Sequence, residues 1–285
     1  MKVKDNFLFC FDISFEAKLN CYIPTAYIIK KTDEINYLDK KASPEVLNSL
    51  GIIFENLDTT TKKVLTICKD LKPENVFKKF SKNSKTAKTI DDLLKDAKLE
   101  FGIRQFKTTN LDQFYSLVKK ENFSLSMNLG REKDFRKSCV TTTHANLETQ
   151  LHFDKHENGI TYTLALKENE KVFHPSQSKI ELLLDDPSWI VVDRKLFHLK
   201  DINSKKISPF LTKKSIEIPS KLVSEYFEKF IKDIAKKVEI TGAGFEIENR
   251  NTIAFCAIEI AHDFFRNTYY INLLFDYKGH TFDYS

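Results

Sequence analysis

Arginine is scarce in this sequence, although basic residues are abundant. Of the 45 basic residues, only six are arginines and the other 39 are lysines. Arginine is the usual side chain for reading guanine edges and for holding phosphates in a two-pronged geometry, whereas lysine acts as a hydrated point charge. The composition therefore disfavours sequence-specific DNA recognition. It leaves contact with the phosphate backbone open.

The excess of positive charge is also small. The formal net charge is +5, and charged residues make up 30% of the chain with both signs interspersed. Such a balance does not demand nucleic acid as a partner. A coding bias toward AT-rich codons would equally produce many lysines and few arginines.

Cysteines are few, and long apolar runs are missing. The five cysteines are scattered without any C-x-x-C pair, which excludes a disulfide framework and a zinc knuckle. The apolar run at the amino end is interrupted by Asp12 and Glu16, so it resembles a strand more than a signal peptide. No run reaches the roughly 20 residues of a membrane span. We expect a cytoplasmic protein without membrane contact.

Nucleotide-binding motifs are missing as well. The chain has no G-x-x-x-x-G-K-[ST] sequence, whose backbone and lysine would hold ATP phosphates. Gly242-Ala243-Gly244 lacks the third glycine of a dinucleotide-binding loop and leads into a strand instead of a helix. We therefore expect a chain that is not itself an enzyme and that binds no cofactor.

The apolar residues are sufficient for a large α+β fold. Hydrophobic residues make up 41% of the 285 residues, and 24 of them are phenylalanines. We predict two domains that meet at the polar passage 130–138. Residues 1–135 form a mixed strand and helix region with a basic helical segment over 44–100. Residues 136–285 form a mostly antiparallel β domain that carries one long amphipathic helix over 219–237.

Local patterns give the expected elements. Strict alternation from Phe7 to Phe15 predicts a strand, and the run 19–29 predicts a second one that lies at an edge or bulge because it contains Pro24. A short strand over 101–106 and a helix over 111–119 follow. Gly159 predicts a hairpin between the runs 147–154 and 159–166. Later strands are expected at 180–184, 189–192, 195–199, 238–241, 245–248, 253–260 and 269–277.

Two lysine-rich stretches are the candidate binding sites, and each contains phenylalanines. A basic cluster of this kind is more often a solvated face than a nucleic-acid contact. If these stretches bind, they should bind phosphates, with an affinity that falls steeply with salt. The candidate nucleic-acid-binding residues are Lys78, Lys79, Lys82, Lys85, Lys205, Lys206, Lys213 and Lys214.

Metal chemistry is a weaker alternative. Asp276 and Lys278 follow a buried-strand pattern as Asp-x-Lys, the second half of a metal-dependent nuclease arrangement whose partner carboxylate would be Glu259 or Asp263. His152 and His156 have the i, i+4 spacing of a helical metal pair but fall on a predicted strand and hairpin. We therefore predict no metal site and keep a Mg²⁺-dependent nuclease as an alternative hypothesis. A protein-docking module without DNA binding is another.

Several short motifs occur in a recognisable order. They are Phe80-Ser81-Lys82, Ile103-Arg104, Lys205-Lys206-Ile207-Ser208-Pro209-Phe210, Lys214-x-Ile216-x-Ile218-Pro219, Tyr226-Phe227-x-x-Phe230 and Gly244-Phe245-x-Ile247. Together they resemble the region that precedes the motor in bacterial Swi/Snf-type DEAD/DEAH-box helicases. The likeness extends from about residue 60 onward, and Ala243 stands where the family pattern has an acidic residue.

The resemblance implies an accessory, non-catalytic part of an ATP-dependent DNA translocase. Its implied partners are double-stranded DNA, bound through the phosphate backbone, and C-terminal motor lobes of the same polypeptide. ATP and Mg²⁺ would belong to those lobes, and none of their catalytic residues can be assigned here. The last residues, HTFDYS, begin a strand pattern and stop, so we expect the polypeptide to continue beyond Ser285.

Overall fold

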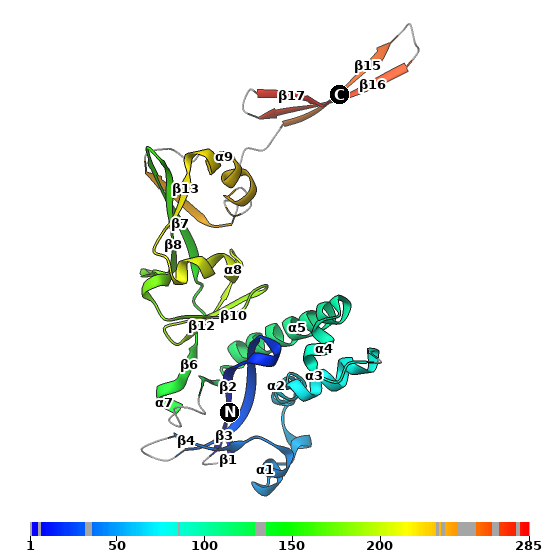
Figure 1. Cartoon of the computed structure of the whole chain (residues 1–285), viewed down its shortest axis with the longest axis vertical. Coiled ribbons are helices and arrows are strands. Elements are labelled where there is room, and N and C mark those ends of the chain that lie inside the picture. The colour runs from blue at the N-terminus through cyan, green and yellow to red at the C-terminus, as the bar shows by residue number, and fades with distance from the viewer. Residues whose placement is uncertain are drawn as a thin grey trace. The chain divides into compact units, whose positions relative to one another are not determined.

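The chain folds into two compact units, residues 1–244 and 245–285. The computed structural model (Figure 1) describes residues 2–4, 7–31, 36–84, 86–128, 135–231, 234, 237–243, 255–263, 268–277 and 280–284. Helices and mixed sheets both contribute substantially, which confirms the predicted α+β class. In the described part of the chain, no helix is long and apolar enough to cross a membrane.

A nine-stranded mixed sheet forms the largest part of the first unit. Its order is β10-β11-β12-β6-β5-β2-β3-β4, and β1 also pairs with β2. Parallel pairings join β2 to β5 and β12 to β6, and the others are antiparallel. The strands are β1 (Lys2–Lys4), β2 (Phe7–Glu16), β3 (Cys21–Lys31), β4 (Asn36–Lys41), β5 (Ser124–Met127), β6 (Cys139–Thr142), β10 (Ile180–Leu184), β11 (Ser188–Val192) and β12 (Lys195–Leu199).

The predicted boundary between residues 135 and 136 falls inside this sheet. It lies at the short helix α7 (Phe135–Ser138), between β5 and β6, which pair with each other. The division by packing lies instead at Gly244. Pro24 lies in β3 opposite Ile13 of β2, whereas β4 pairs only with the far end of β3, from Tyr27 onward. The proline therefore occupies a stretch of β3 that needs no donor toward β4.

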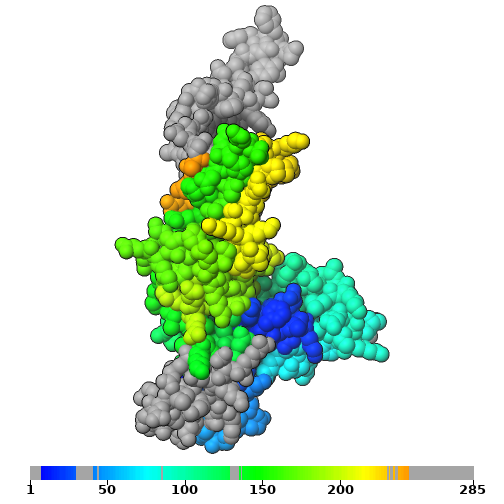
Figure 2. All heavy atoms as spheres, turned by 60° about the vertical axis from the view of Figure 1, so that its left-hand side comes forward, coloured from blue at the N-terminus to red at the C-terminus, as the bar shows by residue number. Residues whose placement is uncertain are grey.

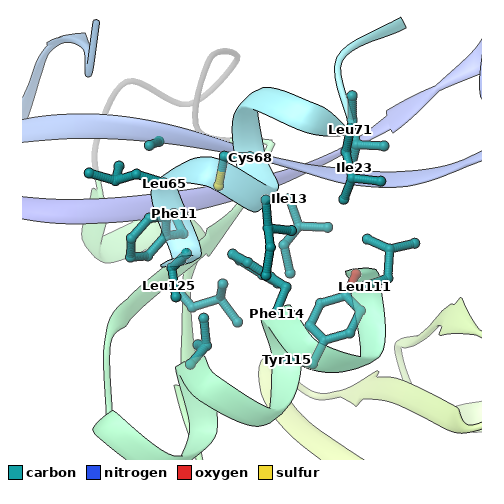
Figure 3. Packing of buried hydrophobic residues seen from close by; sticks show 14 of the residues in the cluster. Phe11, Ile13, Ile23, Leu65, Cys68, Leu71, Leu111, Phe114, Tyr115 and Leu125 are labelled. Carbon is teal, nitrogen blue, oxygen red and sulfur yellow. The ribbon is translucent and has the colours of Figure 1, made fainter. Parts of the chain in front are cut away.

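Helices pack on one face of β2, β3 and β5 and close the main core. Phe11 and Ile13 of β2 meet Phe114 of α5, Leu65 of α2 and Leu125 of β5 (Figure 3). All five side chains are buried. The helices of this part are α1 (Pro44–Ser49), α2 (Thr59–Asp70), α3 (Pro73–Phe80), α4 (Ile90–Leu94) and α5 (Ala97–Glu121), with short 3₁₀ turns η1 (Ala17–Leu19), η2 (Phe54–Asn56) and η3 (Ser81–Asn83).

The predicted strand over 101–106 is wrong, because these residues belong to α5. Asp96 begins the helix by accepting hydrogen bonds from the backbone N–H groups of Lys98 and Leu99 at 2.9 and 3.1 Å. Ile103 and Leu111 are buried on the face that continues to Val118, which is helical spacing. The alternation of apolar residues over 101–106 is too short to distinguish a strand from this stripe.

A five-stranded sheet holds the predicted hairpin. β7 (Glu148–His156) and β8 (Gly159–Glu168) form an antiparallel pair joined by the turn Glu157-Asn158. The strand order of the sheet is β13-β8-β7-β14, and β9 (Lys171–Phe173) also pairs with β8. Gly159 has a φ of +152°, as expected for glycine in this turn. β13 (Ile216–Pro219) and β14 (Glu239–Ala243) complete the sheet, the latter in parallel with β7.

The segment predicted as a long amphipathic helix begins where expected, after Pro219. It is built from η6 (Ser220–Leu222), α9 (Val223–Tyr226) and the π-helical turn η7 (Phe227–Ile231). Phe227 packs on Phe153 of β7 at a ring distance of 5.3 Å. Residues 232, 233, 235 and 236 lie outside the described residues. A single continuous helix over 219–237 therefore stays a prediction.

The remaining elements are short or belong to the second unit. Strands predicted at 180–184, 189–192 and 195–199 are confirmed by β10, β11 and β12. The run predicted at 245–248 lies outside the described residues. The other helical turns of the first unit are η4 (Pro175–Gln177), α8 (Ser204–Ile207) and η5 (Ser208–Leu211). The described part of the second unit is an antiparallel sheet of β15 (Phe255–Asp263), β16 (Thr268–Tyr277) and β17 (His280–Tyr284).

Candidate nucleic-acid interface

The first lysine stretch lies on α3 and η3. Lys78 and Lys79 occupy the last turn of α3 and Lys82 lies in η3, and all three are exposed. Lys85 lies outside the described residues. The Nζ atom of Lys79 lies 4.5 Å from the ring centre of Phe106 in α5, a cation–π contact that fixes this side chain.

The phenylalanines of the first stretch point into the protein. Phe77 and Phe80 are partly buried against the main core, and Phe80 packs edge-to-face on Phe106 with ring centres 5.8 Å apart. The same holds in the second stretch, where Phe197 and Phe210 are buried. Phe197 and Phe210 therefore offer no stacking surface for bases, and Phe77 and Phe80 pack against the core, whereas Lys78, Lys79 and Lys82 are exposed.

The second lysine stretch lies on α8, η5 and the residues that follow. Lys205, Lys213 and Lys214 are exposed, and Lys206 is partly buried beside a cavity. In the space-filling view, this part of the chain (yellow) lies at the surface beside the green strands of the five-stranded sheet (Figure 2). The Nζ atom of Lys205 lies 3.2 Å from Asp185 Oδ2, an exposed ion pair.

Buried anchors hold the second stretch in place. Ser204, Ile207 and Phe210 are each 2% exposed or less. The Oγ atom of Ser204 donates toward the Leu184 carbonyl at 3.2 Å and lies 3.0 Å from Asp185 Oδ1. Three buried side chains within seven residues leave α8 and η5 little freedom to move. The exposed lysines are therefore displayed from a fixed turn.

A groove of about 680 Å³ runs between α5, β3, β10 and α8. Its apolar floor includes Phe15 and Tyr22. Its charged residues are three cations and three acids, namely Arg104, Lys107, Lys205, Glu100, Asp185 and Asp186. Lys107 donates to the Leu19 carbonyl at 2.6 Å. The groove is consequently balanced in charge, and it does not extend either lysine stretch into a basic channel.

The first lysine stretch packs on one side of α5, and another side of that helix lines the groove beside the second stretch. Phe80 of α3 lies against Gly102 and Phe106, whereas the groove beside Lys205 is lined by Arg104 and Lys107. At about 100° per residue, the pair 102 and 106 lies on another side of the helix from the pair 104 and 107. The structure does not join the two stretches through a shared contact.

A second cavity, of about 410 Å³, gathers lysines that the sequence does not place together. Lys200 at the end of β12, Lys206 of α8 and Lys237 before β14 line it, and so does His198 of β12. Lys119 of α5 lies close enough to His198 to lower the pKa of its imidazole, and Lys200 in turn lowers the pKa of Lys119. We call His198, Lys200, Lys206 and Lys237 the lysine cavity, and Lys119 lies beside it. No sequence motif indicates the cavity, because its members come from three separate parts of the chain.

The metal alternatives have little geometric support. In the β15–β16 register, Asp276 faces Phe255 and Glu259 faces Asn272, a separation of four residues or roughly 13 Å along the strands. Asp263 is farther still, and Lys278 lies outside the described residues. One Mg²⁺ ion needs carboxylate oxygens at about 2.1 Å, so this register separates the proposed ligands.

The histidine pair is occupied by neighbouring side chains. The Nδ1 atom of His152 lies 2.7 Å from Thr241 Oγ1, and its Nε2 lies 3.2 Å from Asp154 Oδ1. His156 Nε2 lies 3.0 Å from Thr161 Oγ1. Within the described residues, no group of three or more histidine, cysteine, aspartate or glutamate side chains could hold a metal ion.

Comparison with known proteins identifies one family. The family model described as bacterial SNF2 helicase associated matches residues 104–285. No curated protein and no solved structure matches the chain. The match confirms the resemblance seen in the motifs of residues 205–247. It includes the second lysine stretch, whereas the first stretch precedes the matched range.

Proposed function

This chain belongs to the bacterial SNF2 helicase-associated family, and from that premise we propose that it binds the phosphate backbone of duplex DNA and positions the duplex for the helicase motor. The chain itself is non-catalytic in this proposal. Its protein partner is the set of C-terminal motor lobes of the same polypeptide. ATP and Mg²⁺ act only in those lobes. A downstream reading frame without motor motifs would contradict the proposed partner.

The fixed turn at α8 and η5 carries the proposal. It presents Lys205, Lys213 and Lys214 to solvent from a base of buried side chains. A backbone that is already held in place loses less freedom when the protein binds a ligand, so contacts made from it contribute more to affinity. Lysine ammonium groups are point charges that suit phosphate oxygens and do not discriminate bases.

The first lysine stretch is the second contact region in this proposal. Lys78, Lys79 and Lys82 are exposed on α3 and η3, and Lys85 belongs to the same stretch of sequence. Because this stretch packs on one side of α5 and the second stretch lies beside a groove on another side, each needs its own variant. If one duplex contacts both stretches, the losses of binding free energy caused by the two variants should be independent and additive.

Fluorescence anisotropy with a labelled duplex of arbitrary sequence tests the proposal. The affinity of the wild-type chain should fall between about 50 and 200 mM salt, with a slope of about 0.9 per phosphate contact. Replacing Lys205, Lys213 and Lys214 with glutamate should weaken binding and lower that slope by up to about 2.7. Sequence changes in the duplex should have little effect.

The matched control changes three lysines that do not belong to the proposed interface. Lys18, Lys63 and Lys120 are exposed and lie on η1, α2 and α5. Replacing them with glutamate alters the net charge by the same amount. Equal loss of affinity in both triple variants, or a salt-independent affinity in the wild type, would contradict a localised phosphate contact. Cleavage of the duplex in the presence of Mg²⁺ would instead favour the nuclease alternative.

A further inference from the structure

The lysine cavity is lined by His198, Lys200, Lys206 and Lys237 together with the carboxylates of Asp186 and Asp201, and Lys119 lies beside it. Lys119, Lys200 and Lys237 make no ion pair with any residue in the described part of the chain. Some nearby lysines are paired, since Lys195 lies 2.8 Å from Glu168 and Lys205 lies 3.2 Å from Asp185. Lys200 and Lys237 are exposed and line the cavity without an ion pair among the described residues.

Two acids near the cavity accept hydrogen bonds from N–H donors. Asp112 of α5 accepts one from the Trp189 indole at 2.8 Å, and Asp201 Oδ2 accepts one from the Thr149 backbone N–H at 2.6 Å. The other oxygen of Asp201 is buried without a hydrogen-bond partner in the described part of the chain, and Asp186 lies in the wall of the cavity but is exposed. Glu148 and Glu239 line an adjoining cavity together with Lys200 and Lys237. The lysines therefore outnumber the carboxylates in the cavity wall but are not isolated from them.

Burial and neighbouring positive charges both act on the titrating groups at this cavity. Burial and the nearby charge of Lys200 lower the pKa of Lys119. Burial lowers the pKa of His198, and Lys119 and Lys200 lower it further, against an opposing contribution from Asp112. Crowding of like charges costs stability. A bound anion would relieve that cost.

We propose that the lysine cavity binds a phosphate group. Its volume of about 410 Å³ is large enough for a small ligand. Trp189 stacks on the His198 ring, with centres 4.5 Å apart and planes 13° apart, and this stacking fixes the wall of the cavity. The phosphate belongs either to the DNA backbone or to a free phosphorylated molecule. Only the DNA case rests on the function proposed above.

Calorimetric titration with pyrophosphate, and anisotropy with duplex DNA, would test the cavity in the full chain. The test variant replaces Lys200 and Lys237 with glutamine, and the control replaces Lys18 and Lys63, which lie elsewhere on the surface. We expect the test variant to lose about tenfold or more in affinity for at least one probe, equivalent to about 1.4 kcal/mol. The control should keep the wild-type affinity for both.

The titration of His198, followed by NMR, gives a second readout. A phosphate beside the imidazole should raise the pKa of His198, because an anion stabilises the protonated ring. The same addition should leave this pKa unchanged in the Lys200/Lys237 variant. A purely structural role for the lysines would not produce this difference.

The outcomes separate the two sources of phosphate. Loss of pyrophosphate binding with unchanged DNA affinity would assign a free phosphorylated ligand, and loss of DNA affinity would assign the DNA backbone. The proposal would be overturned if the test variant and the wild type had equal affinities for both probes. It would also be overturned if the wild type bound no pyrophosphate and the test variant kept the wild-type affinity for DNA. Failure of the Lys205/Lys213/Lys214 variant to affect DNA binding would defeat the proposed function without deciding the pyrophosphate result.

Discussion

Gly159→Ala should detach β13 from the five-stranded sheet. A Cβ atom at this position would lie 2.1 Å from the carbonyl oxygen of Ile218, and the φ of +152° is strained for any residue with a side chain. The obstructing atom belongs to the backbone, so a rotamer change cannot relieve the clash. The strand itself must move away from β8.

The cost follows from what β13 contributes. Ile218 is 3% exposed, and removing such a side chain from its buried site costs about 1.5–3 kcal/mol. Each backbone hydrogen bond lost, such as the 3.0 Å bond from Ser220 N–H to the Asn158 carbonyl, adds about 0.5–1.5 kcal/mol. A total of about 3 kcal/mol should lower the Tm by roughly 6–12 °C in a unit of this size.

Thermal unfolding followed by circular dichroism measures this effect, and Gly102→Ala is the matched control. In α5, the added Cβ would lie 3.3 Å from the edge of the Phe80 ring, which can shift, and alanine favours the helix over glycine by about 1 kcal/mol. The control should unfold near the wild-type Tm. A Gly159→Ala variant with the wild-type Tm would refute the packing of β13 on β8 described above.

Two further predictions concern local electrostatics. Asp58→Ala should lower the free energy of unfolding, measured in urea, by about 1 kcal/mol. Asp58 accepts hydrogen bonds from the Thr61 N–H at 2.8 Å and from the Thr61 Oγ1 hydroxyl at 2.6 Å at the start of α2. Asp58→Asn should retain most of the stability, because asparagine is also a good N-cap residue. Acidification from pH 7 toward pH 5 should lower the free energy of unfolding, because the pKa of His198 is lowered in the folded chain and the unfolded chain then binds more protons. His198→Gln should reduce this pH dependence, and an unchanged dependence would contradict it.

Elements defined by short-range patterns could be predicted from the sequence. The alternation on both sides of Gly159 predicts β7 and β8, and the three later strands fall within a residue of β10, β11 and β12. Thr89 and Asp92 cap α4 by reciprocal hydrogen bonds, which is another local pattern that spans only four residues. Patterns of this kind need no knowledge of distant parts of the chain.

Long-range pairing could not be predicted in the same way. β2 pairs in parallel with β5, more than a hundred residues later, and β12 pairs in parallel with β6. Nothing in either strand specifies its parallel partner, because register depends on the packing of the whole sheet. The lysine cavity depends on the same long-range arrangement. Lys200, Lys206 and Lys237 line one cavity only because the end of β12, α8 and the segment before β14 converge.

The direction of the aromatic side chains decides which kind of binding the lysine stretches can support. Phenylalanines interleaved with lysines in the sequence are typical of a surface that stacks bases. Here Phe80 and Phe210 pack against Phe106 and Tyr162 inside the protein, while Lys79 and Lys205 are exposed. With so few arginines, the exposed groups are almost entirely ammonium charges. On the proposed function, the chain would therefore hold a duplex in place without reading its sequence, and any choice of site would have to come from the motor or from DNA shape.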